Sequence, residues 1–120
     1  MSASLIGGTA SASAALAFNA QTGTTYTLVL ADADNKLVTL SNASAITVTI
    51  PLNSSVAFPT GSQINLIQIG AGQVTIQGAG GVTVVSTGAT AATPKCRAQY
   101  AAATLIKRDT DSWYVIGDIS

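Results

Sequence analysis

Apolar and polar residues alternate with a period of two from Thr25 to the C-terminus. The alternation is clearest at 25–30, 46–50, 73–77 and 82–84, and the segments 36–40 and 63–69 have the same character. Because this period places successive side chains on opposite faces, each segment predicts a strand with one buried face. Segment 63–69 is apolar on both faces, which favours a central strand or one covered by a neighbouring subunit.

Turn-forming residues separate these segments. Asp, Asn, Ser, Gly and Pro gather at 32–35, 41–44, 53–55, 59–61 and 78–81, as is typical of β-turns. The turn at 109–112 is flanked by the segments 100–107 and 113–118, which predict a terminal hairpin. About eight short strands without a helical pattern predict an all-β fold, built as an antiparallel β-sandwich, a jelly roll or a barrel.

The N-terminal segment 1–23 lacks this alternation. It is rich in Ala and Ser, and its sizeable apolar residues are Leu5, Ile6, Leu16 and Phe18. Such a composition cannot build a local core, so we predict an extended arm at 1–23 that becomes ordered on a partner through these four side chains. The alternative is a terminus that stays flexible. The remaining residues, 24–120, are predicted to form a single β domain.

Composition adds a prediction about the surface. Charged residues make up only 8% of the 120 residues, and five cations are balanced by five Asp, with no His; an average protein has about 25%. Scattered cations do not form the basic stripe that a nucleic-acid partner requires. A net charge of zero promotes association, so we expect a homo-oligomer. No apolar run is long enough to cross a bilayer, and no membrane partner is expected.

Candidate metal and phosphate sites are weak. The pairs Asp32/Asp34 and Asp109/Asp111 carry oxygen ligands of the kind that Ca²⁺ prefers, but neither loop has a closing bidentate acid. Exposed Asp residues that cap their own turns are the favoured interpretation. The glycine-rich segments 70–72 and 78–81 precede alternating residues rather than a helix, so they predict tight turns and not a phosphate cradle.

Catalytic chemistry is not predicted either. No Ser or Cys has a His to act as its base, so we expect a protein that is not an enzyme and has no cofactor, metal or small-molecule substrate. Cys96 has no partner for an intrachain disulfide and is expected to be a small buried side chain. Trp113 is predicted to anchor the core through the last hairpin. The alternative is a sugar platform formed by Trp113 and Tyr114.

Several segments together resemble a module of bacteriophage virion proteins. They are TYTLVLADA at 25–33, TVTIP at 47–51, VAFPTGSQI at 56–64, GAGQVT at 70–75 and ATLIK at 103–107, followed by Trp113 and Gly117-Asp118. The resemblance covers about 24–120 and is a pattern of structural proteins from phage tails, fibres and heads. It carries no catalytic residues.

As a free-standing small chain, the protein resembles a capsid decoration, or cement, protein. This resemblance implies a trimer on the outer surface of the capsid that clamps neighbouring capsomers, with the major capsid protein as its partner. The alternatives are a tail-fibre, collar or baseplate component that contacts the host surface, or a carbohydrate-binding β-sandwich.

Overall fold

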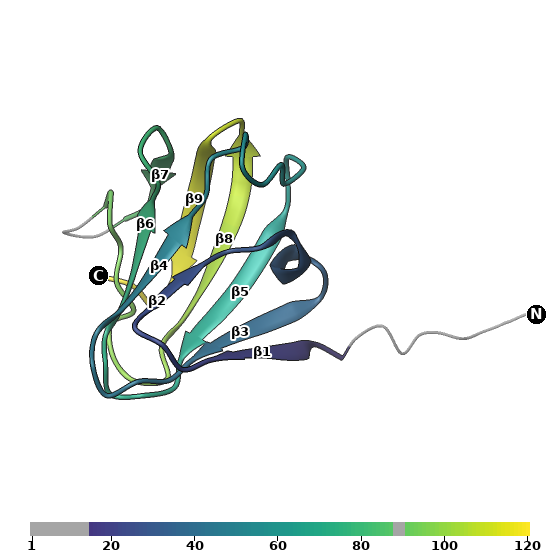
Figure 1. Ribbon diagram of the computed structural model, residues 1–120. Coiled ribbons are helices and arrows are strands. Elements are labelled where there is room, and N and C mark those ends of the chain that lie inside the picture. Colours follow the sequence, from purple (N-terminus) through teal and green to yellow (C-terminus); the bar gives the residue numbers. More distant parts are fainter. Residues whose placement is uncertain (1–14, 88–90) are drawn as a thin grey trace, which may run out of the picture.

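The computed structural model describes residues 15–87 and 91–120, which form two β-sheets (Figure 1). The larger sheet has six strands, in the order β1 (Ala17–Gln21), β3 (Lys36–Leu40), β5 (Gln63–Gln68), β8 (Ala102–Asp109), β9 (Ser112–Gly117) and β7 (Thr83–Val85). The smaller sheet has three strands, in the order β2 (Thr25–Thr27), β4 (Ile46–Ile50) and β6 (Val74–Gly78). A 3-10 helix, Leu30–Ala33, follows β2. The all-β prediction is confirmed.

The first six strands are wound as three parallel coils. The chain passes from the larger sheet to the smaller one in each coil, as β1–β2, β3–β4 and β5–β6, and each strand pairs in parallel with its counterpart one coil later (Figure 1). Five of the seven strand pairings are parallel, so the predicted antiparallel order was wrong. The physical reason is that alternation reports which face of a strand is buried and not the direction of its neighbour.

The C-terminal strands form the predicted hairpin. Strands β8 and β9 pair antiparallel, and β8 also pairs antiparallel with β5. Asp111 adopts a φ of 53° in the connecting turn, a conformation that Asp tolerates better than most residues. Strand β5 therefore lies between β3 and β8, which confirms the central position expected for segment 63–69.

The corners between the two sheets stack on one another. The Asn42 side-chain amide donates to the Thr22 carbonyl (2.8 Å) in the preceding corner, and the Gly72 N–H donates to the Asn42 carbonyl (2.8 Å). A Cβ atom at position 72 would lie 1.8 Å from the Ser44 carbonyl oxygen, so only glycine fits there. The glycine-rich segment 70–72 is thus a stacked corner of the fold.

The core lies between the two sheets as one cluster. The larger sheet contributes Val38, Leu40, Ile64, Leu66, Leu105, Trp113 and Val115, and the smaller sheet contributes Ile46, Val48, Ile50, Val74 and Ile76. Trp113 is 1% exposed, and its ring meets the Phe58 ring edge-on with centroids 5.3 Å apart.

Strand β1 lies within the range 1–23 that was assigned to the arm. It pairs with β3 along its whole length, from Ala17 opposite Lys36 to Gln21 opposite Leu40. Of the four arm residues, Leu16 and Phe18 belong to the structured part, and Leu5 and Ile6 lie outside the described residues. Within residues 15–87 and 91–120, no helix has the length and apolar character needed to cross a membrane.

Candidate interaction surface

Among residues 15–87 and 91–120, the smaller sheet packs on one face of the six-stranded sheet and no second layer covers the other face (Figure 1). We call this second face, formed by the outward side chains of β1, β3, β5, β8 and β9, the outer face. Its large apolar residues are Phe18, Leu37, Ile67, Ile106, Tyr114 and Ile116. Three of these are strongly exposed, Phe18 at 73%, Ile116 at 50% and Tyr114 at 42%.

Strand register brings these side chains into rows. Phe18 lies opposite Leu37, Leu37 opposite Asn65, and the row continues through Thr104 to Ile116. Directly opposed side chains of neighbouring strands are close enough to touch. Phe18 and Leu37 are therefore neighbours at one side of the face and Ile106 and Tyr114 at the other, with the polar Asn65 and Thr104 between the two groups.

Polar groups in the middle of the outer face bind one another. The Thr104 hydroxyl donates to the Asn65 side-chain oxygen (2.8 Å), and the Gln63 amide makes a longer contact of 3.5 Å with the same oxygen. The outward side chains between the two ends of the sheet carry no charge. Arg108 stands at one end of this face, where β8 ends, with its guanidinium 5.3 Å from the Tyr114 ring centre. Lys36, at the start of β3, alternates with Leu37 and lies on the side of Val38 and Leu40.

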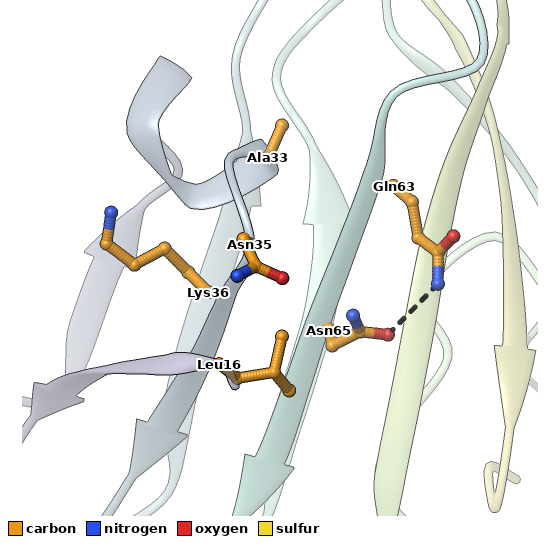
Figure 2. Close-up of a pocket in the computed structure, with 6 residues that line it drawn as sticks. All are labelled: Leu16, Ala33, Asn35, Lys36, Gln63 and Asn65. Carbon is orange, nitrogen blue, oxygen red and sulfur yellow. Dashed lines mark hydrogen bonds between the residues drawn. The ribbon is translucent and has the colours of Figure 1, made fainter. Parts of the chain in front are cut away.

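A pocket of about 310 Å³ opens at the end of the outer face near the 3-10 helix. It is lined by Leu16, Ala33, Asn35, Lys36, Gln63 and Asn65. Figure 2 shows Leu16 directed toward Asn65, whereas the Lys36 ammonium points away from it. Carboxamides donate and accept hydrogen bonds but do not transfer protons near neutral pH, so this lining suits binding and not acid–base chemistry.

The structure places both described arm residues at this surface. Leu16 lines the pocket and Phe18 stands in a row of the outer face. The sequence interpretation missed Ile106 and Ile116 and considered Tyr114 only for a sugar platform. Their signal was present, because Ile106 follows the buried Leu105 and both faces of the hairpin are therefore apolar.

Asp32 is 2% exposed, so the expected exposure of this turn residue was wrong. The 3-10 helix folds over the end of the first coil, and the Asp32 carboxylate accepts hydrogen bonds from the Tyr26 hydroxyl (2.6 Å), the Asn19 amide (2.8 Å) and the Val29 N–H (3.0 Å). Burial raises the pKa of Tyr26 to about 12, and the hydrogen bond to Asp32 and its negative charge add to the effect. The cluster closes the first coil with satisfied polar groups.

The remaining chemical candidates take ordinary structural places. Asp109 accepts a hydrogen bond from the next backbone N–H (2.7 Å), and in the described part of the chain no three Asp, Glu, His or Cys side chains gather as metal ligands would. Burial, helped by the negative charge of Asp118, raises the pKa of Cys96 to about 11. Trp113 and Tyr114 point to opposite faces of β9, which excludes a shared sugar platform.

Comparison of the chain with protein-family models, curated proteins and solved structures gave no significant match. The described residues present a sheet face with exposed apolar side chains around an uncharged polar centre, with Arg108 and the amide-lined pocket at one end.

Proposed function

We propose that the protein is a non-enzymatic structural protein of a bacteriophage virion, a trimeric cement protein that sits on the outer surface of the capsid and clamps neighbouring copies of the major capsid protein. The observation that carries the proposal is the exposed apolar outer face, which has no charge between its ends. The resemblance of residues 24–120 to phage virion modules supplies the setting.

The outer face could drive association through the apolar surface area that it would bury. Soluble monomers rarely leave large contiguous apolar patches in water, and burial of such a patch contributes about 25 cal/mol per Å² before the costs of association are subtracted. Because the Thr104 hydroxyl already bonds to Asn65, part of the polar centre enters an interface with its hydrogen bonds made. An unpaired polar group would oppose burial by about 1–3 kcal/mol.

In this proposal the sheet makes the contacts within the trimer, and the arm makes the contacts beyond it. The outer face joins the subunits of the trimer, and the arm residues Leu5, Ile6, Leu16 and Phe18 extend the contact to the neighbouring subunit or to the capsid. Phe18 belongs to both, since it lies on β1 beside Leu37 of the outer face.

Sedimentation equilibrium of the full chain at micromolar concentration tests the oligomer. We expect a trimer for the wild type and a monomer for Ile116→Lys, because a charge at this exposed apolar position of the outer face opposes burial. Leu30→Lys is the matched control, since Leu30 is similarly exposed (54%) but lies on the 3-10 helix; it should remain trimeric. A monomeric wild type would contradict the proposal.

Electron microscopy of intact virions carrying a tagged copy tests the location. We expect the tag on the outer capsid, at positions between capsomers. A tag on the tail fibre, collar or baseplate would replace the cement function with the tail alternative. Absence from purified virions would contradict a virion protein altogether.

A further inference from the structure

Lys107 is a lysine of the inner face of β8 and is only 3% exposed. Its Nζ donates to the Asn53 side-chain oxygen (2.5 Å) and to the Phe58 carbonyl (2.7 Å). In the described part of the chain the ion pair found is Arg97–Asp118, so Lys107 has no carboxylate as a direct partner. A buried cation without an anion costs free energy, and the fold nevertheless directs this amine at a carboxamide.

The carboxamide that faces Lys107 is itself held in place by Asp111. Asn53 is half-buried in the loop after β4, and its backbone N–H donates to the Asp111 carboxylate (2.6 Å). The Phe58 and Trp113 rings pack edge-on beside them, with Trp113 directly opposite Lys107 in the strand register. An amine and a carboxamide are thus in contact at the edge of the core, and a carboxylate holds the backbone of the residue that carries the carboxamide.

The amine is within reach of the carboxamide carbon. Since the Nζ–Oδ1 distance is 2.5 Å and a C=O bond is about 1.2 Å long, Asn53 Cγ lies no farther than about 3.7 Å from Nζ. Reacting atoms held about 3–3.5 Å apart are positioned for attack. A bond forms once Nζ shifts from the carboxamide oxygen to the face of Cγ.

We propose that Lys107 and Asn53 join spontaneously in an intramolecular amide bond. Nζ attacks Asn53 Cγ, the Nζ–Cγ bond forms, and the Cγ–Nδ2 bond breaks. Two protons leave the Lys107 ammonium and are taken up by the departing Nδ2, which leaves as ammonium, while Asp111 holds the Asn53 backbone N–H and so positions the carboxamide. No atom changes its oxidation state and no co-reactant is required.

The product suits its place in the fold. A neutral secondary amide replaces a buried ammonium, and the new bond ties the loop after β4 to β8 across 54 positions of the sequence. A cross-link of this kind stabilises a fold chiefly by restricting the unfolded chain. The inference is independent of the proposed function, because it concerns the chemistry of the core and not the outer face.

The intact mass of the denatured full chain tests the proposal. We expect a mass lower than that of the sequence by one ammonia, and a protease digest that contains one linked pair of peptides, one carrying Asn53 and the other Lys107. A mass equal to that of the sequence, or separate unmodified peptides, would overturn it.

Variants distinguish the cross-link from cyclisation of Asn53 onto its own backbone, which also releases ammonia. Lys107→Arg keeps the positive charge and should show no loss, whereas Lys95→Arg, the control, should show the full loss. In Asn53→Asp the loss should become one water. Retention of the ammonia loss in Lys107→Arg would overturn the proposal, and if that variant does not fold, the linked peptides of the wild type decide.

Discussion

Trp113 and Tyr114 are neighbours on β9 and belong to the two opposite faces of the six-stranded sheet. Both faces are rich in apolar side chains, yet Trp113 is 1% exposed and Tyr114 is 42% exposed. The difference comes from the smaller sheet, which covers the inner face alone. Apolar residues of the inner face therefore stabilise the single chain, whereas Phe18, Tyr114 and Ile116 of the outer face stay exposed in it.

The comparison is tested most strongly by truncating each of the two neighbours. Trp113→Ala should lower the free energy of unfolding by about 3–5 kcal/mol, because it leaves a cavity beside Phe58. Tyr114→Ala should change it by no more than about 0.5 kcal/mol in the isolated subunit. Urea denaturation measures both values. Equal losses would show that the two faces do not differ as described.

The polar end of the inner face provides the next largest effect. Asp32→Ala removes the acceptor of the Tyr26 hydroxyl, the Asn19 amide and the Val29 N–H. Buried donors left without a partner cost about 1–3 kcal/mol, so this variant should unfold at a lower urea concentration. Asp34→Ala, at an exposed position of the same turn, is the control and should unfold at the wild-type concentration.

The ionisation of the buried Cys96 thiol provides a third test, because it depends on how well the core excludes water. Its pKa is about 11 in the folded chain, against an ordinary value of 9.0, so the folded state favours the thiol. The resulting stability is fully present below pH 9 and is lost as the pH rises through about 11. Cys96→Ala should therefore show a smaller alkaline loss of stability than the wild type in urea titrations at pH 8 and pH 11. Equal alkaline losses would mean that the thiol is accessible to water.

The sequence predicts where the strands lie far better than it predicts how they pair. Strands β3 and β4 match the expected segments 36–40 and 46–50 residue for residue. The alternation is regular in the second segment, and Pro51 ends it. Parallel pairing depends on contacts between successive coils. Asn42, for example, bonds to Thr22 in the corner before it and to Gly72 in the corner after it. No local sequence pattern links these three residues.

The candidate surface was predictable only in part. The two-sided apolar character of segment 63–69 indicated an outer face, but its extent depends on which strands lie beside β5. The burial of Asp32 follows from a 3-10 helix that folds over the first coil, and a turn-rich sequence does not reveal that fold. Lys107 and Asn53 are 54 positions apart in the sequence, and no motif spacing predicts that they come into contact.

The smallest effect is expected at the ion pair of Arg97 and Asp118, because both of its side chains are exposed to water. The guanidinium donates two hydrogen bonds to the carboxylate, at 2.7 and 2.9 Å, and these hold the pKa of Asp118 below its ordinary value. A lowered pKa in the folded state means that the stabilisation is present above the unfolded pKa and is lost as the pH falls through the folded one. Asp118→Asn should therefore lower the urea midpoint slightly at neutral pH and low salt. The difference should vanish in concentrated salt, which screens exposed charges, and also at a pH low enough to protonate Asp118. A difference that persists in concentrated salt would show that Asp118 stabilises the fold by packing rather than by exposed charge. The distinction between a buried inner face and a solvent-exposed periphery would then not hold at this ion pair.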